Sequence, residues 1–209
     1  MKPASKQIID AISLKTPGEI LFLTDFRGLG TDSAIRTTLS RMSLEGKLKR
    51  LAQGIYLKPK IDPVLGELLP GPEELAQTIA EKEQIRIKPS GAYALNKLGL
   101  STQVPTRLVY ITDGKSRQIR LGKTVILFKE TTPKKLSMKG KYSSLIIQAL
   151  GELDLRQVDP IIEQKLMELL GKETGENLLF DLKLAPSKVH DYIVQLLKKM
   201  KNDRLVIPK

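Results

Sequence analysis

The sequence has no cysteine, no tryptophan and a single histidine among its 209 residues, and aromatic residues make up only 4% of it. Without cysteine the chain can form no disulfide, no thiolate nucleophile and no Cys-ligated zinc site, and a reducing compartment suits it. It also lacks the uninterrupted apolar run of a signal peptide or a membrane span. We therefore expect a soluble, cytoplasmic protein with no membrane partner.

Residues that carry enzyme chemistry are equally scarce. The one histidine, His190, lies in an amphipathic helical pattern, where a structural or surface role is commoner than that of a base. The segment "GLG" at 28–30 lacks the spacing and the lysine of a nucleotide-binding loop. Asp113 and Gly114 fit a tight hairpin turn better than a metal site, because too few carboxylates accompany them. We expect no catalytic residue, no cofactor and no metal, and a protein that is not an enzyme.

Positive charge, by contrast, is in excess. The formal net charge is +12 and the sequence pI is about 9.8, which favours a polyanionic partner such as nucleic acid over a generally basic surface without one. Residues 1–60 hold 11 Lys and Arg against 5 Asp and Glu, and residues 86–142 hold 13 against 2. An acidic stretch, 61–85, separates these two blocks. The sequence therefore predicts two cationic surfaces.

The first 60 residues predict a winged helix-turn-helix domain. Hydrophobic periodicity and turn residues indicate a helix at 5–14, a brief helix at 25–30 and a third helix from Thr31 or Asp32 to about Glu45. A short apolar run precedes the brief helix, and a basic hairpin at 47–58 with its turn at "QG" follows the third helix. This order of elements is that of a DNA-binding helix followed by a wing.

The third helix separates its apolar side from a face of short hydroxyls and arginines. Arginine offers a planar donor fork for guanine or phosphate, and short hydroxyls let a helix backbone approach the major groove. A solvated cationic face, or a winged helix used for protein contact, is the alternative. The DNA contacts that we expect from this face and from the hairpin are Ser33, Arg36, Thr37, Ser40, Arg41, Lys47, Lys49, Arg50, Gln53 and Lys58.

A second domain, 61–209, is expected to complete an α+β fold. It begins with a Pro- and Gly-rich linker at 60–72. Three strands joined by tight turns are expected to form a small antiparallel sheet, and a helical tail follows. The expected helices are 72–85, a short one from Ser90, 142–152, 158–170, 174–183 and 188–201, and the expected strands are 106–114, 116–122 and 123–131.

The strands and the segment after them carry a second basic surface. It comprises Arg107, Lys115, Arg117, Arg120, Lys123, Lys134 and Lys135. Composition alone leaves open whether this surface meets an acidic protein, RNA, flanking DNA or only solvent.

The segments "SAIRTTLSRMSLEGKLKRLAQGIYLKPK", "ALNKLGLSTQVP" and "LLFDLKLAPSKV" together resemble the type IV abortive-infection (AbiEi-like) antitoxins, over residues 5–195. The resemblance implies a transcriptional autorepressor whose N-terminal winged helix binds inverted repeats in the double-stranded DNA of its own promoter. It also implies a C-terminal region that counteracts a cognate toxin with a nucleotidyltransferase fold. Two alternatives remain open: a nucleic-acid-processing enzyme with a DNA-binding front end, and an interaction module without a toxin. The oligomeric state is left open as well.

Overall fold

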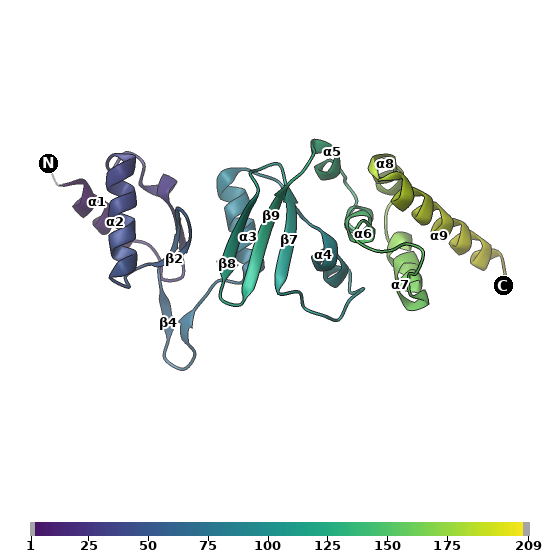
Figure 1. Cartoon of the computed structure of the whole chain (residues 1–209), viewed down its shortest axis with the longest axis horizontal. Coiled ribbons are helices and arrows are strands. Elements are labelled where there is room, and N and C mark those ends of the chain that lie inside the picture. The colour runs from purple at the N-terminus through teal and green to yellow at the C-terminus, as the bar shows by residue number, and fades with distance from the viewer. Residues whose placement is uncertain (1–2, 207–209) are drawn as a thin grey trace. The chain divides into compact units, whose positions relative to one another are not determined.

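The structure is a computed structural model that describes residues 3–206, with side chains described up to residue 202. It is an α+β protein with helices and small sheets at its N-terminal end, a central four-stranded sheet and helices toward its C-terminal end (Figure 1). The chain divides into two compact units. Unit 1 contains the residues up to Lys82 together with Ile119–Lys123, and unit 2 contains Glu83–Gln118 and the residues from Thr124 onward. The predicted domain limit at residue 60 stays a prediction.

Unit 1 begins with the elements of a winged helix. In chain order they are α1 (Ala4–Ser13), β1 (Ile20–Phe22), the 3₁₀ helix η1 (Leu23–Phe26), α2 (Asp32–Leu44), β2 (Lys49–Ala52) and β3 (Ile55–Leu57). The three strands form an antiparallel sheet in the order β1-β3-β2. The hairpin β2–β3, which follows α2, therefore pairs through β3 with β1, which precedes α2. The predicted winged arrangement and the amphipathic division of α2 are confirmed.

The core of this winged helix comes from the apolar stripes of α1 and α2. Ile8 is fully buried on α1, and Ile35 and Leu39 are buried on α2. They pack with Phe26 of η1, which is also fully buried. The brief helix predicted at 25–30 is wrong in its bounds: the helical turn covers Leu23–Phe26, because the Asp25 carboxylate accepts a hydrogen bond from the Phe22 N–H at 2.8 Å and fixes the turn earlier.

The segment predicted as a linker at 60–72 forms a second hairpin. It consists of β4 (Lys60–Asp62) and β5 (Gly66–Leu68), which pair antiparallel with each other. The Asp62 carboxylate accepts hydrogen bonds from the N–H groups of Val64 and Leu65 at 2.8 and 2.9 Å and closes the turn. Pro and Gly therefore mark a tight turn here rather than a flexible connection. The helix α3 (Pro72–Glu83) follows the hairpin, as predicted.

The central sheet has the strand order β6-β7-β9-β8 and is mixed rather than antiparallel. Its strands are β6 (Ile87–Pro89), β7 (Arg107–Thr112), β8 (Arg117–Leu121) and β9 (Thr124–Glu130). β7 runs parallel to β9, in register from Arg107 opposite Val125 to Thr112 opposite Glu130. The prediction that β7 and β8 are neighbours in a simple antiparallel sheet is wrong. β7 and β9 bury most of their apolar side chains and take adjacent positions, whereas β8 exposes alternate polar residues and lies at the edge.

The helices of unit 2, apart from the short one at 133–136, share one apolar core. They are α4 (Gly91–Lys97), α5 (Pro133–Leu136), α6 (Ser143–Leu150), α7 (Pro160–Gly171), α8 (Gly175–Leu184) and α9 (Ser187–Val206). Ile146, Leu166 and Ile193, from three different helices, are fully buried in this core. The four predicted C-terminal helices and the helix after Ser90 are confirmed, whereas β6 and α5 were not predicted. Among residues 3–206 the structure contains no helix of the length and apolarity needed to cross a bilayer.

A buried carboxylate anchors the loop before α6. Asp181 of α8 is fully buried, and its oxygens accept hydrogen bonds from the N–H groups of Lys139 and Gly140 at 2.7 and 2.9 Å and from the Ser143 hydroxyl at 2.6 Å. Glu173 accepts from the N–H groups at the start of α6, at 2.7 Å from Tyr142. These contacts lower the pKa of Glu173, although burial acts in the opposite direction. The loop is held by α8 and by the turn between α7 and α8.

Candidate nucleic-acid interface

The helix α2 begins where its sequence provides a cap. The Thr31 hydroxyl accepts a hydrogen bond from the Ala34 N–H at 3.2 Å, and Asp32 lies at the positive end of the helix. The helix ends at Leu44, and Gly46 adopts a φ of +71°, which allows the chain to reverse toward β2. The 13 residues of α2 span about 20 Å, enough to lie along a major groove.

The polar face of α2 is exposed along its whole length. All five predicted residues on this helix are exposed, namely Ser33, Arg36, Thr37, Ser40 and Arg41. Arg36 has no carboxylate partner within the described part of the chain, whereas Arg41 Nε lies 3.8 Å from a Glu45 carboxylate oxygen, a loose pair between exposed side chains. The centre of the face therefore offers an arginine fork whose donors no acidic group occupies.

Arg27 joins this face, although the sequence analysis did not select it. It lies in the turn between η1 and α2, and with Arg36 it lines a small cavity of about 160 Å³ beside the start of α2. The turn glycines around it were the available signal.

The hairpin of β2 and β3 turns at Gln53 and Gly54. Gly54 has a φ of +77°, and a Cβ there would lie 3.1 Å from Leu23, so both backbone and space call for glycine. Gln53 and Arg50 are exposed, and among the described residues Arg50 has no ionic partner. Arg50 and Gln53 are thus the wing residues whose side chains are available to a ligand.

Two further lysines of the wing are engaged by carboxylates. Lys47 Nζ lies 2.7 Å from Glu45, and Lys49 Nζ lies 2.5 Å from Glu67 of β5. All four side chains remain partly exposed, so these ion pairs are weak in water and can be exchanged for a phosphate. The pair with Lys47 is the main reason that the pKa of Glu45 is lowered.

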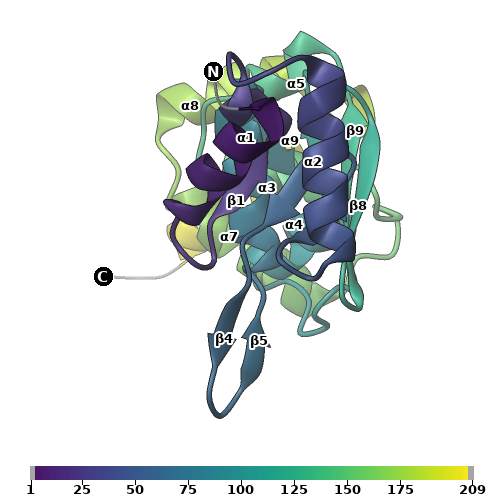
Figure 2. The same cartoon turned by 90° about the vertical axis from the view of Figure 1, so that its left-hand side faces the viewer.

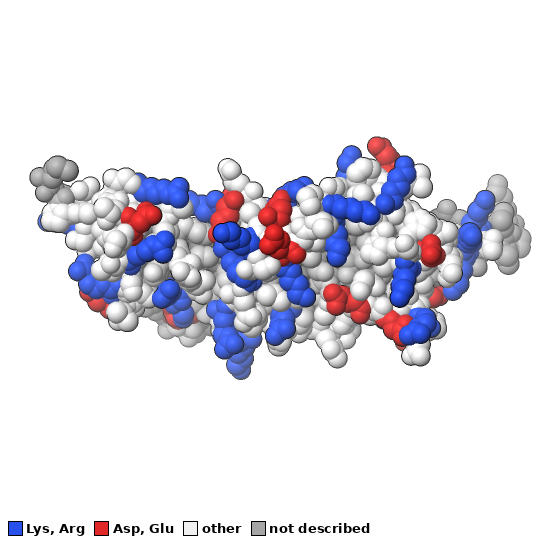
Figure 3. Space-filling view, turned by 45° about the horizontal axis from the view of Figure 1, so that its top comes forward, with Lys and Arg blue, Asp and Glu red and all other residues white. Residues whose placement is uncertain are grey.

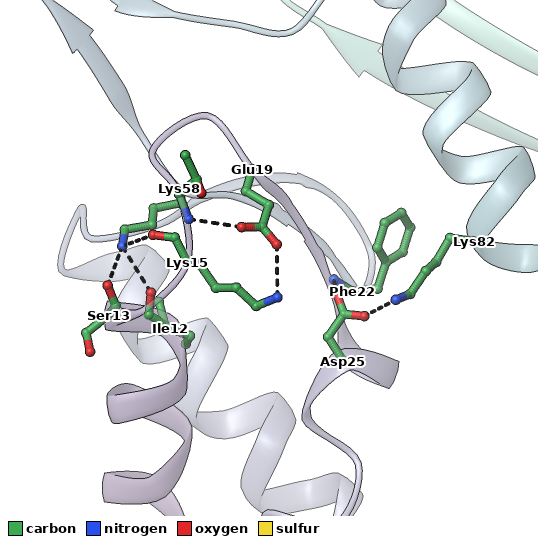
Figure 4. Close-up of polar contacts among 9 residues, drawn as sticks. Ile12, Ser13, Lys15, Glu19, Phe22, Asp25, Lys58 and Lys82 are labelled. Atoms are coloured by element: carbon green, nitrogen blue, oxygen red, sulfur yellow. Dashed lines mark hydrogen bonds and ion pairs between the residues drawn. The ribbon is translucent and has the colours of Figure 1, made fainter.

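Lys58 has a different environment from the other predicted DNA contacts. Its ammonium donates hydrogen bonds to the carbonyl oxygens of Ile12, Ser13 and Lys15, at 3.1, 2.9 and 2.5 Å (Figure 4). These are carbonyl groups at the end of α1 and just after it, where a cation is favourable. Lys58, which directly follows β3, therefore links the end of β3 to the end of α1, and the three N–H donors of its ammonium are occupied.

The Asp25 carboxylate ties the winged helix to α3, and the nearby Glu19 pairs within the winged helix itself. Asp25 forms an ion pair with Lys82 of α3, whose ammonium also lies 5.8 Å from the centre of the Phe22 ring (Figure 4). Glu19 pairs with Lys15 at 2.9 Å, and that hydrogen bond is the main cause of the lowered pKa of Glu19 and the raised pKa of Lys15. The Asp25–Lys82 pair thus lies within unit 1, which contains α2 and α3 up to Lys82.

A comparison with protein-family models identifies the chain. Residues 7–178 match the model described as a family of unknown function, DUF6088. The chain belongs to this family. No curated protein matches it. The matched region of this DUF6088 protein includes α2, the wing, the central sheet and the start of α8, so the interface described above lies within the part that defines the family.

The second basic surface of the DUF6088 protein does not form one continuous site. Arg117 donates two hydrogen bonds of 2.7 Å to the Glu83 carboxylate, so its charge is neutralised. Arg86 likewise pairs with Asp113 at 2.8 Å and holds the pKa of that carboxyl below its usual range. Asp113, considered above as a metal ligand, is therefore engaged by arginine, and the described residues contain no cluster of three metal-ligating side chains.

The other cations of this surface lie at two ends of the sheet. Arg107 begins β7 and Lys123 immediately precedes β9, whereas Lys115 follows β7, and Lys134 and Lys135 lie in α5 beyond the end of β9. Because β7 and β9 are parallel, these groups are separated by the length of a six-residue strand, about 20 Å. Arg120 lies on the edge strand β8, three residues before Lys123. Figure 3 shows Lys and Arg interspersed with Asp and Glu on the face in view.

His190 remains apart from these surfaces. Its Nδ1 lies 2.9 Å from the carboxylate of the adjacent Asp191, and both side chains are well exposed. It therefore lies on the outside of α9, which is one of the two expected roles, structural or surface.

Proposed function

We propose that this DUF6088 protein is a DNA-binding transcriptional autorepressor and the antitoxin of a bacterial type IV toxin-antitoxin system, acting in the cytoplasm. The observation that carries the proposal is the exposed face of α2. It presents Arg36 without an acidic partner among the described residues, flanked by the hydroxyls of Ser33, Thr37 and Ser40. Arginine forks and short hydroxyls are the side chains that read base edges and approach phosphates in a major groove.

The wing supplies a second contact. Arg50 and Gln53 are exposed on the hairpin after α2, and Arg27 extends the cationic side at the start of that helix. In winged-helix proteins such a hairpin contacts phosphate or the minor groove, which fixes the register of the helix on the duplex. We leave Lys58 out of the proposed interface, because its ammonium is engaged by three backbone carbonyl groups.

The test of DNA binding is the affinity of the full chain for the promoter region upstream of its own gene. Replacing Arg36 and Arg41 together by alanine removes two base or phosphate contacts of about 1–3 kcal/mol each, so binding should be abolished at working concentrations. The matched control is Arg156→Ala, which removes an exposed arginine of unit 2 and should leave affinity unchanged. Fluorescence anisotropy at several salt concentrations gives both affinity and salt dependence, and unaltered binding by the double variant would refute the assignment of α2.

The antitoxin part of the proposal is supported by the resemblance of the chain to AbiEi-like antitoxins. Its test uses the Arg36→Ala, Arg41→Ala chain, co-expressed with a nucleotidyltransferase-like protein encoded beside its gene. If unit 2 carries the antitoxin activity, the variant should rescue growth as well as the unaltered chain while failing to repress a promoter reporter. Loss of rescue in a variant that remains folded would contradict this division of labour.

A further inference from the structure

The hairpin of β4 and β5 carries three large aliphatic side chains in open solvent. Ile61 is 76% exposed, Val64 is 90% exposed and Leu65 is 75% exposed. Figure 2 shows the two strands projecting away from the other elements of unit 1. Aliphatic side chains that gather on a projecting element mark a surface that another molecule covers.

The backbone of the same hairpin has open edges. Among the described residues, β4 and β5 pair only with each other, as a two-stranded sheet. A two-stranded hairpin is marginal in water by itself, and an unpaired edge offers N–H and C=O groups to a further strand. The side chains therefore favour a covering partner. The backbone groups that β4 offers to a further strand are those between Pro59 and Pro63, two residues that have no N–H to donate.

We propose that the hairpin pairs with the same hairpin of a second copy of this chain, through an antiparallel two-fold contact between the two β4 strands. The result is a four-stranded sheet, in the order β5-β4 of one copy followed by β4-β5 of the other. This self-association goes beyond the proposed DNA binding and does not depend on it.

The distribution of charge selects β4 as the pairing edge. A two-fold axis through Ile61 places Lys60 opposite the partner's Asp62, and Asp62 opposite the partner's Lys60, so unlike charges face each other on both sides of the axis. The two Ile61 side chains meet at the axis. The same operation on β5 would set Glu67 against the partner's Glu67, and like charges directly opposite each other are unfavourable.

Nucleic acid fits the hairpin less well than a second copy does. Apolar side chains at the tip of an arm can wedge between base pairs, but they do so beside cationic or neutral polar residues. Here the carboxylate of Asp62 accepts hydrogen bonds from the N–H groups of Val64 and Leu65, so a negative charge lies next to the two apolar residues of the tip. Glu67 lies opposite Ile61 in the hairpin. The Asp62 carboxylate would approach the phosphates of a duplex, whereas Glu67 is paired with Lys49.

The size of the contact sets its expected strength. A stable interface buries about 800 Å² on each partner, more than one short hairpin can supply. We therefore expect a monomer–dimer equilibrium that depends on protein concentration rather than an obligate dimer. A covalent trap is the appropriate first test.

The absence of natural cysteine makes that trap specific. Ile61→Cys introduces a single thiol at the proposed axis, where directly opposite Cα atoms of antiparallel strands lie about 4.5–5.5 Å apart, within the range of a disulfide. Mild oxidation of the full chain without DNA should convert most of it to a covalent dimer, seen by non-reducing gel and by mass. The control is Leu179→Cys, another exposed aliphatic position, 65% exposed on α8, which should stay monomeric.

The register is tested without cysteine. Lys60→Glu places two acidic side chains opposite each other and should weaken the dimer in sedimentation velocity at least about tenfold, and adding Asp62→Asn should restore part of the association because it removes the repulsion and keeps the turn acceptor. Failure of Ile61→Cys to cross-link, or equal cross-linking of the Leu179→Cys control, overturns the proposal. So does a monomeric chain whose promoter affinity falls when Val64 and Leu65 are replaced by serine, because the tip would then contact DNA.

Discussion

Asp181 is a fully buried carboxylate whose oxygens accept three hydrogen bonds from the segment that leads into α6. A Cβ on Gly140 would lie 2.9 Å from one of these oxygens and 1.9 Å from the Ser143 hydroxyl. Only glycine therefore fits at position 140 in this arrangement. The sequence could not reveal this arrangement, because nothing in the local pattern distinguishes Asp181 from an ordinary exposed polar residue of an amphipathic helix. Its partners lie about 40 residues earlier in the chain.

We predict that Asp181→Ala destabilises the protein by about 3–5 kcal/mol, because it leaves one buried N–H group, one partly buried N–H group and a buried hydroxyl without their acceptor. Urea unfolding followed by circular dichroism measures the change. Asp191→Ala, which removes an exposed carboxylate of α9, is the control and should change stability by less than about 0.5 kcal/mol. Similar stability of the two variants would show that the loop does not need Asp181.

At the scale of elements, long periodic segments were predictable and short or non-local ones were not. The apolar stripe of α2, with Ile35 and Leu39, determined its buried side, because 3.6-residue periodicity is a local property. β6 and α5 have three and four residues, too few to show a period. The parallel pairing of β7 with β9 depends on competition among strands for central positions, which no local pattern expresses.

The candidate interface was predictable to the same extent. The face of α2 follows from its helical pattern, and Gly54 indicates the turn of the wing. The role of Lys58 depends on where α1 ends in space, and the ion pairs of Lys49 and Arg117 depend on contacts 18 and 34 residues away. Charge patterns indicate that a cation is present, but only the packing of elements determines which cations remain available.

Lys58 gives a prediction for the element α1. Lys58→Met keeps the length of the side chain and removes hydrogen bonds to three carbonyl groups, so it should destabilise unit 1 by about 1–3 kcal/mol. The folded variant should bind the promoter with an unchanged salt dependence, whereas Arg50→Ala should reduce the slope of log affinity against log salt by about 0.9. A reduced slope for Lys58→Met would restore Lys58 to the DNA contacts.

At the scale of the whole molecule, acid should destabilise the fold. The pKa values of Glu19, Asp113, Glu163 and Glu173 are all lowered, by hydrogen bonds from lysine, arginine or backbone N–H groups. A carboxyl whose pKa is lower in the folded state stabilises the fold above its unfolded pKa, near 4, and loses that contribution as the pH falls through its folded value. The net positive charge also grows on acidification and adds repulsion.

We therefore predict that the urea midpoint falls steadily between about pH 5 and pH 2 and is nearly constant from about pH 6 to pH 8. Glu163→Gln, which replaces the partner of Tyr192 and Lys199, should lower stability at neutral pH and flatten the acid limb. A midpoint that rises on acidification would show that these carboxylates do not stabilise the fold.

The parallel pairing of β7 with β9 also bears on the order in which a ribosome can complete this protein. β7 is synthesised before its parallel neighbour, and its last residue, Thr112, cannot pair until Glu130 has been synthesised. Unit 1 includes Ile119–Lys123, so its full set of residues is likewise complete only after more than half the chain has been made. The apolar strand β7 is thus left without its parallel partner during translation, a period in which exposed strands are prone to wrong pairing. The antiparallel pair β2–β3 of the winged helix, whose strands follow each other directly in the chain, has no such delay.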